Sequence, residues 1–395
     1  MRRLRVENFL SLRNINISLT KLNVLIGPNA SGKSNFAKLF QLLYNVASTG
    51  LPELQGYTFR DLVYCFDETL RISIELSFEV DGGEASYLLW IHRDGYEEEL
   101  RAGGETLVRA EGEPSHLVVH SKLVEDLKPA RGLYRVEGTP FYRLDSPLLS
   151  RGSGKSNLLS KYLRYSVLRD RPRILLERLP ALAAISDFLQ SASIHSLDPR
   201  CIRGSIEVRA QPKLDFHGCN LARALLQLKL EDLDTFHRVE EAIKSLVPEV
   251  EEVVPYIIPG TDEVELRLRA RGLGLLKPHN ISDGTLRMLA IATILYTTDS
   301  LVFIDEPENS IHPHLLEALV DLARDSPAQV VIATHSPTLL DYVEPREVLI
   351  VDKVGAETRA ARIEDPETVD AVRKYLEKGG TLGELWYSGA LGGTP

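Results

Sequence analysis

The chain has 395 residues and a formal net charge of −10, with 44% hydrophobic and 26% charged residues. This length is enough for a large core and two lobes, and the composition is typical of a globular protein. The negative charge argues against a protein that coats nucleic acid through its overall charge, although a local basic patch stays open.

The sequence pattern argues against several other classes of protein. No apolar run approaches the length of a membrane span, and the basic N-terminus lacks the apolar core of a signal peptide. We therefore expect a cytoplasmic location and no membrane partner. The cysteines Cys65, Cys201 and Cys219 lie far apart and form no C-x-x-C pair, so we expect neither a disulfide framework nor a structural zinc site.

Residues 1–45 predict two or three strands, a glycine-rich loop and a helix. Residues 27–34 fit G-x-x-x-x-G-K-[ST], between an apolar run at 22–26 and a helical pattern after residue 34. Such a loop turns its backbone N–H groups toward phosphate oxygens, and the helix dipole adds positive potential. The candidate nucleotide-binding residues are Gly27, Pro28, Asn29, Ala30, Ser31, Gly32, Lys33, Ser34 and Asn35.

Two residues of this loop have specific expected roles. Lys33 would contact the β- and γ-phosphates of ATP and assist catalysis, and the Ser34 hydroxyl would bind Mg²⁺. A glycine turn beside a solvated lysine is the plain alternative, but it does not account for the strand and helix on either side.

Residues 71–120 change to alternating polar and apolar residues. Gly-containing turns separate the alternating segments, which predicts an antiparallel meander with one solvated face. The expected strands are residues 71–80, 85–92, 97–101, 106–110 and 116–120.

Residues 121–190 have more helical and loop signals, and they contain the most basic part of this acidic chain. Two tyrosines, Tyr162 and Tyr165, lie among its basic residues. A solvated face or loop explains this composition, and contact with DNA phosphates or an acidic partner is the alternative. The basic residues are Arg151, Lys155, Lys161, Arg164, Arg169, Arg171, Arg173 and Arg178.

The remainder of the chain predicts a parallel sheet preceded by helices. Helical patterns cover residues 219–230 and 232–246, and residues 264–269 alternate as a strand. From residue 281 onward helices alternate with apolar strands, which is typical of a parallel sheet. These apolar strands are residues 301–304, 330–333 and 348–351.

The first of these strands ends in two carboxylates, Asp305 and Glu306. A buried strand of this kind would place the acids at the carboxyl edge of the sheet, where α/β sheets bind ligands. Asp305 would then hold Mg²⁺ and Glu306 would polarise the attacking water. By itself the pair is equally compatible with a strand followed by a polar turn, and the phosphate loop favours the catalytic interpretation.

Two more candidate motifs lie at the ends of predicted elements. His335 ends the next strand, where it would reach a γ-phosphate, although a lone histidine is more often structural. Residues 281–287 precede an apolar helix, and a helix cap at Ser282 or Asp283 with Gly284 relieving crowding explains that fragment completely.

Together these motifs resemble the ABC-type ATPase head of the AAA family, and within it the RecF, SMC and OLD (overcoming lysogenization defect) branch. The similar segments are F-x-S at 9–11, GPN-x-SGKSN at 27–35, S-D-G-T at 282–285 and E-N-x-x-H-P at 308–313. Residues 218–221 and 386–393 also resemble this group. The resemblance covers residues 1–45 and about 190–393, and leaves the middle to a family-specific insertion.

The resemblance implies a fold and a division into parts. The fold would be an α/β P-loop NTPase head with a mixed or parallel core sheet, an antiparallel β-subdomain and a helical lobe. Residues 1–120 would form ATPase lobe I, 121–190 an insertion, 191–300 the helical lobe with the signature motif, and 301–395 the rest of the ATPase core.

The resemblance also implies a mechanism. Ser282, Asp283 and Gly284 would form the signature of one subunit and meet the nucleotide held by a second, so that a homodimer sandwiches two ATP molecules. His335 would be the switch histidine that senses the γ-phosphate, and Asn309 would fall in the segment that crosses the interface.

The chain departs from its relatives at several positions. Ala30 replaces a commoner glycine, and Leu10 stands where relatives often have a basic residue near the adenine, a role that Arg13 is placed to take. Gln190 and Gln211 are the candidates for a lobe-linking glutamine. Only about sixty residues follow His335, which is too short for the Toprim nuclease of OLD proteins, so we expect a stand-alone head.

We therefore expect an ATPase that acts as a dimerisation switch in a DNA transaction or controls a separately encoded effector, such as a nuclease in a defence or toxin system. A nucleotide- and DNA-binding scaffold with incidental hydrolysis is one alternative. A transport ATPase subunit is another, against which the S-D-G-T signature and the N-terminal strand argue.

Overall fold

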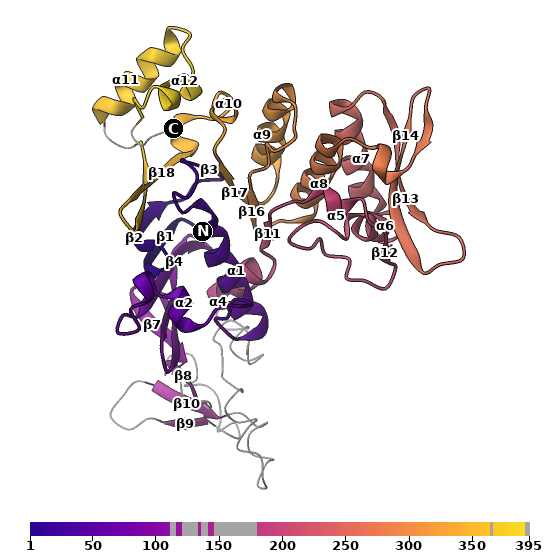
Figure 1. The fold of residues 1–395 in the computed structure, drawn as a ribbon. Helices are drawn as coiled ribbons and strands as arrows, with labels where there is room; N and C mark the ends of the chain where they lie inside the picture. Colours follow the sequence, from indigo (N-terminus) through magenta and orange to yellow (C-terminus); the bar gives the residue numbers. More distant parts are fainter. Residues whose placement is uncertain (111–115, 121–132, 136–140, 146–179, 364–365, 392–395) are drawn as a thin grey trace. The chain divides into compact units, whose positions relative to one another are not determined.

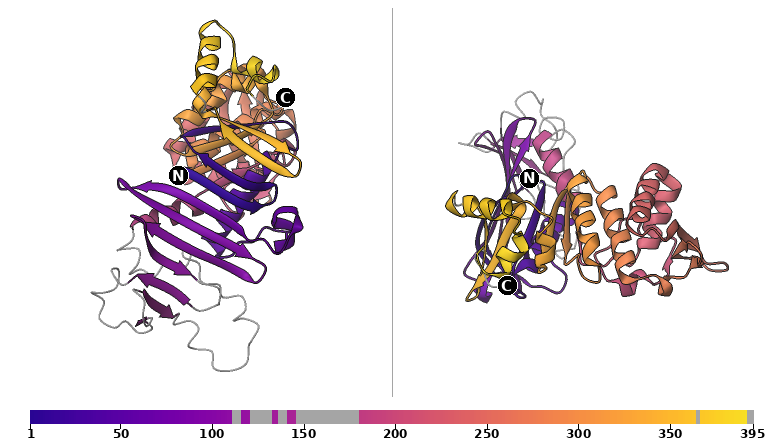
Figure 2. Two further views of the ribbon diagram at one scale, coloured as in Figure 1. Left: turned by 90° about the vertical axis from the view of Figure 1, so that its left-hand side faces the viewer. Right: turned by 90° about the horizontal axis from the view of Figure 1, so that it is seen from above.

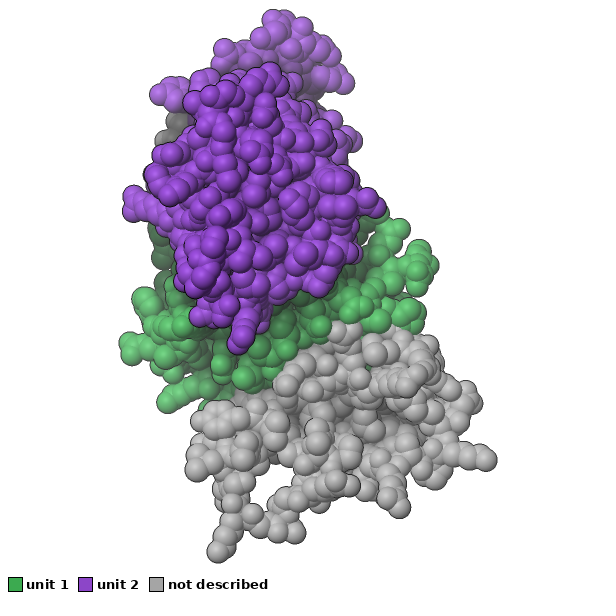
Figure 3. Space-filling view, turned by 90° about the vertical axis from the view of Figure 1, so that its right-hand side faces the viewer, with its two compact units in different colours: residues 1–19, 38–191, 353–360 green, residues 20–37, 192–352, 361–395 purple. Residues whose placement is uncertain are grey.

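The computed structural model describes residues 1–110, 116–120, 133–135, 141–145, 180–363 and 366–391. The chain divides into two compact units, shown in different colours in Figure 3. Unit 1 comprises Met1–Leu19, Lys38–Ser191 and Lys353–Ala360, and unit 2 comprises Thr20–Ala37, Ala192–Asp352 and Ala361–Pro395. The basic residues of segment 151–178 lie outside the described residues, so the role of this segment stays a prediction.

Unit 1 is built on an antiparallel sheet of nine strands in the order β2-β1-β4-β5-β6-β7-β8-β10-β9. Neighbouring strands from β4 to β8 follow chain order, as the alternating pattern of residues 71–120 predicts, and Figure 2 shows them side by side. The strands are β1 (Arg3–Phe9), β2 (Leu12–Ser18), β4 (Ile72–Val80), β5 (Gly83–His92), β6 (Gly95–Ala102), β7 (Glu105–Ala110), β8 (His116–His120), β9 (Leu133–Arg135) and β10 (Phe141–Asp145).

Strand β4 shows how one face of this sheet becomes apolar, because buried residues alternate along it. In β4 the residues Ile72, Ile74 and Leu76 are fully buried, while their neighbours in sequence are more exposed. Helix α4 (Pro180–Gln190) packs on β4, and Phe188 meets Phe78 edge to face at 5.5 Å between ring centroids. The short helices α2 (Phe59–Leu62) and η1 (Tyr64–Phe66) also belong to unit 1.

Unit 2 contains a six-stranded sheet in the order β11-β16-β17-β3-β18-β19, whose first four pairings are parallel. Its central strands are apolar on both faces, which is typical of a parallel sheet covered by helices. The parallel sheet expected from the sequence is thus present (Figure 1). The strands are β3 (Leu22–Ile26), β11 (Ser193–His195), β16 (Leu301–Asp305), β17 (Gln329–Thr334), β18 (Val348–Val354) and β19 (Glu357–Arg362).

Unit 2 also contains a second, antiparallel sheet and the helices α6, α7 and α8. Helix α8 is buried along almost its whole length, because its residues are apolar on all sides. Strands β13 and β15 were not expected from the sequence; each pairs with the predicted strand β14. The elements are α5 (Pro199–Ile202), β12 (Ile206–Glu207), α6 (Leu221–Glu231), α7 (Leu233–Leu246), β13 (Val250–Ile257), β14 (Glu263–Ala270), β15 (Gly274–Leu276), η3 (Pro278–Asn280) and α8 (Asp283–Thr297).

The other helices of the described residues come after β16, apart from α1 (Lys33–Thr49), which begins at the phosphate loop and continues from unit 2 into unit 1. Helix α12 packs on α10, where Gly383 lies so close that a Cβ atom would be 2.5 Å from the Pro337 carbonyl oxygen. These helices are η4 (Pro313–Leu315), α9 (Leu316–Asp325), α10 (Pro337–Leu340), η5 (Pro345–Glu347), α11 (Pro366–Glu377) and α12 (Leu382–Tyr387).

Two cysteines are paired, contrary to the expectation from the sequence. Cys201 and Cys219 form a disulfide with their Cα atoms 4.8 Å apart. The backbone of Asp198 donates to the carbonyl of His217 at 3.0 Å, so the two segments lie side by side in the fold. This pairing brings together cysteines 18 positions apart, which spacing alone does not reveal.

No helix in the described part of the chain combines the length and the apolar character that a bilayer crossing needs.

Candidate functional site

The phosphate loop connects the buried strand β3 to helix α1 in unit 2, as the sequence predicts. Gly27 has no room for a side chain, because a Cβ atom would lie 2.0 Å from the Val351 carbonyl oxygen. Ala30 and Gly32 have left-handed backbones, with φ of 63° and 105°. The left-handed region costs an L-residue roughly 1 kcal/mol, so Ala30 replaces glycine at a strained position rather than at an unconstrained one.

Lys33 is folded back over its own loop. Its ammonium group donates to the carbonyl oxygens of Gly27 at 2.6 Å and Pro28 at 2.9 Å, and the residue is only 6% exposed. Burial lowers the pKa of Lys33, while the charges of Glu306, Asp305 and Glu308 act in the opposite direction. The cation is therefore held where loop oxygens and nearby carboxylates take the place of water.

Ser34 and Asp305 meet across the sheet edge. The Ser34 hydroxyl donates to Asp305 Oδ2 at 3.1 Å. Burial raises the pKa of Asp305, the hydrogen bond from Ser34 lowers it, and the charge of Glu306 raises it again. A hydroxyl and a carboxylate in an environment with excess negative charge are the oxygen ligands that Mg²⁺ prefers, so the residues present fit that ion.

Glu306 follows directly, and its backbone is left-handed with φ of 46°. Its N–H donates to the Ala333 carbonyl at 2.8 Å, and its Oε2 accepts from Asn309 Nδ2 at 2.9 Å. The other oxygen, Oε1, lies 3.4 Å from Nδ1 of His335. A strained backbone held by flanking contacts is a common feature of functional sites.

His335 lies immediately after β17 and its side chain is 41% exposed. Because β16 and β17 pair in parallel, with Asp305 opposite Ala333, their carboxyl ends place His335 beside the acidic pair. The structure thus brings Lys33, Ser34, Asp305, Glu306 and His335 together at one edge of the sheet in unit 2.

The expected signature residues begin helix α8. Ser282 is its N-cap, and its Oγ accepts from the backbone N–H of Thr285 at 3.1 Å. Asp283 pairs with Arg203 at 2.5 Å, and a Cβ atom on Gly284 would lie 2.6 Å from the Ser310 carbonyl oxygen. Capping and close packing therefore account for these residues within one chain, and their role toward a second subunit stays a prediction.

Gln190 and Gln211 each have a local structural role. Gln190 ends α4 and donates to the Ala47 carbonyl at 2.8 Å within unit 1, and the Gln211 carbonyl accepts from Asn220. In the sheet of unit 2, β16 lies between β11 and β17, and β11 ends at His195 rather than at a glutamine. Arg13 lies over the Tyr64 ring at 5.3 Å in unit 1, and its proposed adenine contact stays a prediction.

Two residues near the site have contacts that the sequence motifs did not indicate. Glu308 accepts hydrogen bonds from Thr334 and from the backbone of His335, and Arg287 is buried on helix α8 with its charge acting on Glu308. The only sequence signal for Glu308 was its place in the E-N-x-x-H-P segment, and nothing in the sequence paired it with Thr334.

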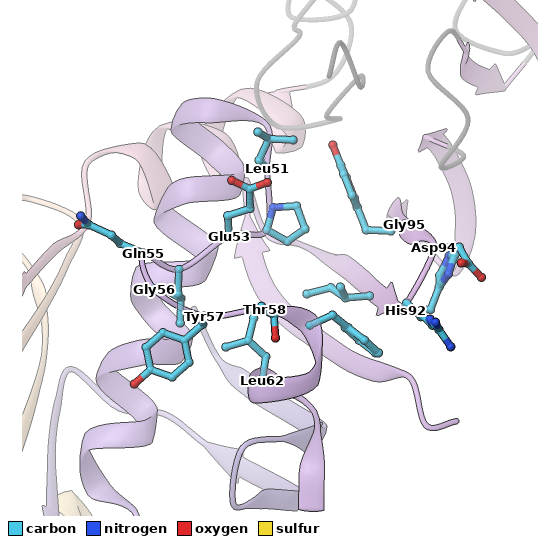
Figure 4. Close-up of a pocket in the computed structure, with 16 residues that line it drawn as sticks. Leu51, Glu53, Gln55, Gly56, Tyr57, Thr58, Leu62, His92, Asp94 and Gly95 are labelled. Carbon is cyan, nitrogen blue, oxygen red and sulfur yellow. The ribbon is translucent and has the colours of Figure 1, made fainter. Parts of the chain in front are cut away.

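Unit 1 contains a separate cavity of about 550 Å³. The connection after α1 forms one wall, and the turn between β5 and β6 forms another; Figure 4 shows Glu53 and Thr58 on the first and His92 and Asp94 on the second. The residues predicted for the nucleotide site do not line it.

Comparison with known proteins agrees with this geometry. The model of an "AAA ATPase domain" matches residues 1–88, and that of an "AAA domain, putative AbiEii toxin, Type IV TA system" matches residues 220–341. The OLD nuclease of Thermus scotoductus is 23% identical over 96% of this chain and 68% of its own length. An SMC head bound to the C-winged helix domain of ScpA has the same fold, with a TM-score of 0.54, 12% identity, and coverage of 92% of this chain and 98% of its own.

These matches are consistent with an ATPase head of the RecF, SMC and OLD type. It also matches shorter segments of transporter subunits, among them the lipoprotein-releasing system ATP-binding protein LolD of Chromohalobacter salexigens. That relative is 33% identical over 22% of this chain and 42% of its own length. The head expected from the sequence motifs is thus confirmed in fold, and the matched family models agree with it.

Proposed function

We propose that this head is an ATP hydrolase that acts as an ATP-driven dimerisation switch. The observation that carries the proposal is the hydrogen bond between Ser34 and Asp305, because it joins the phosphate loop to the acidic strand in one site. That arrangement suits a nucleoside triphosphate whose phosphates rest on the loop.

Each residue has a defined part in the proposed reaction. Backbone N–H groups of the phosphate loop, residues 27–35, would bind the phosphates, with Lys33 supplying positive charge to the β- and γ-oxygens. Ser34 and Asp305 would hold Mg²⁺, which when bound neutralises charge that develops on the phosphates. Glu306 would accept a proton from the attacking water, and His335, 3.4 Å from Glu306, would hydrogen-bond to the γ-phosphate.

Dimerisation completes the proposed site. Ser282 and Gly284 at the start of α8 would meet the γ-phosphate bound by a second copy, so two copies would enclose two ATP molecules. Binding closes the pair, and hydrolysis reopens it.

We propose that the switch works in the cytoplasm on DNA or on a separately encoded effector. The matched family description, which names a putative toxin of a type IV toxin–antitoxin system, and the similarity to a protein named OLD nuclease support this choice.

The decisive experiment measures phosphate release and oligomeric state together. Wild type with ATP and Mg²⁺ should turn over, and Lys33→Ala should lose at least about a hundredfold in rate. Glu306→Gln should bind ATP, stop turnover and accumulate as a dimer in light scattering. A Glu306→Gln protein that stays monomeric with ATP and keeps its biological output would support a nucleotide-binding scaffold instead.

A further inference from the structure

We propose that Glu308 is a positioning residue that fixes His335 for its contact with the reacting phosphate. This inference rests on the proposed hydrolase function and adds a residue to it. The observation that supports it is that one carboxylate oxygen of Glu308 accepts hydrogen bonds from both the Thr334 side chain and the His335 backbone.

The geometry of Glu308 links the ends of two neighbouring strands. Its Oε1 accepts from the Thr334 hydroxyl at 2.6 Å and from the backbone N–H of His335 at 3.2 Å. The same oxygen lies 3.6 Å from Nδ1 of His335. Thr334 is fully buried as the last residue of β17, and Glu308 follows β16, so this carboxylate ties the histidine to the acidic segment.

Glu308 is buried enough for these bonds to be strong. Its side chain is 8% exposed, and a buried charge-assisted hydrogen bond gains strength where water is excluded. Glu308 Oε2 and Arg287 Nε are both buried and lack a hydrogen-bond partner among the described residues. Burial lowers the pKa of Arg287, and among the nearby charges that oppose this shift the charge of Glu308 has the largest effect.

Glu306 also lies near Nδ1 of His335, but its surroundings differ from those of Glu308. Glu306 is 38% exposed and its Oε2 accepts a hydrogen bond from Asn309. Glu308 is buried and accepts a hydrogen bond from the backbone N–H of His335. The exposed carboxylate is placed to act on water, and the buried one is placed to set where the imidazole lies. Substitution of Glu308 should therefore affect catalysis through His335 and leave nucleotide binding by the phosphate loop intact.

The test is a double-mutant cycle on ATP turnover with Glu308→Ala and His335→Ala. Glu308→Ala should lower kcat about tenfold, with the dissociation constant of a fluorescent ATP analogue changed less than about twofold. In the His335→Ala background the same change should cost less than about twofold, because its effect passes through the missing imidazole. Glu308→Gln keeps an acceptor oxygen and should recover part of the rate.

The controls separate this inference from the function on which it rests. Glu241→Gln changes a side chain that is 71% exposed on α7 and should leave kcat unchanged. If Glu308→Ala does not fold, Thr334→Val removes the hydroxyl donor to Glu308 with little change in shape and takes its place in the cycle.

If His335→Ala is impaired while the Glu308 and Thr334 variants keep full kcat, the positioning role is wrong and the hydrolase stands. The same conclusion follows if the two losses are simply additive. If wild type itself releases no phosphate under any nucleotide and metal condition, the proposed function fails.

Discussion

The Ser34 hydroxyl donates to Asp305 Oδ2 at 3.1 Å, which joins a loop near the start of the chain to a strand 271 residues later. Strand β17 lies between β3 and β16 in the sheet, so the two residues reach each other only because all three strands end at one edge. The site therefore depends on the strand order of unit 2 as much as on its motifs.

Loss of either proposed Mg²⁺ ligand, Ser34 or Asp305, should impair hydrolysis that depends on Mg²⁺. We expect Ser34→Ala and Asp305→Asn each to lower kcat at least about tenfold and to raise the Mg²⁺ concentration needed for half activity. Chelation of Mg²⁺ should stop wild-type turnover. Measurement of phosphate release over a Mg²⁺ titration tests this, with the exposed Ser388→Ala as the control. Equal Mg²⁺ dependence in wild type and Asp305→Asn would contradict the assignment.

Signature residues that act across a dimer should complement each other in mixtures. Ser282→Arg and Glu306→Gln proteins should each be inactive. In a dimer of either variant alone, both ATP sites lack the substituted residue. In a one-to-one mixture, half of the dimers would be mixed and each would hold one intact site, so about a quarter of wild-type activity should return. Mixtures that stay inactive, although light scattering shows mixed dimers, would exclude action in trans.

His195 should make stability fall in mild acid. It is buried at the end of β11, donates from Nδ1 to the Asp215 carbonyl and accepts at Nε2 from Ser193, and burial lowers its pKa from 6.5 to about 4. Unfolded chains bind the proton more tightly, so this stabilisation is present above pH 6.5 and is lost as the pH falls toward 4. The loss should be about 3 kcal/mol over that window.

Urea denaturation of wild type and His195→Asn at pH 7.5 and pH 5.0 measures this effect. The difference in unfolding free energy between the two proteins should shrink at the lower pH. His279→Asn, at an exposed position in η3, is the matched control and should leave the pH dependence unchanged. A difference that is the same at both pH values would show that His195 is already charged in the folded protein.

Gly27 should tolerate no side chain. A Cβ atom there would lie 2.0 Å from a backbone oxygen of β18, so Gly27→Ala must shift the loop or the strand. We expect a loss of about 2 kcal/mol or more in unfolding free energy, together with loss of nucleotide binding. Gly83→Ala, where the nearest contact would be 3.6 Å, should change stability by less than about 1 kcal/mol. Equal melting temperatures for the two variants would contradict the packing argument.

Local patterns were enough to predict most of the elements. The alternation of residues 71–80 predicted β4, because a strand with one buried face repeats every two residues. The apolar run ending in Asp305 predicted β16 within one residue. Strand β13 was missed because acidic residues and Pro255 interrupt its alternation, and its place in the sheet comes from pairing with β14.

The sequence by itself determined that a phosphate loop lies between β3 and α1 and that an acidic pair follows an apolar strand, because these motifs are made of neighbouring residues whose spacing carries the signal. Only the tertiary structure decided that Cys201 pairs with Cys219, that Arg203 holds Asp283 and that Glu308 holds Thr334 and His335. Each of these contacts joins residues from 18 to 80 positions apart, and such partners meet through the packing of strands and helices rather than through any local pattern.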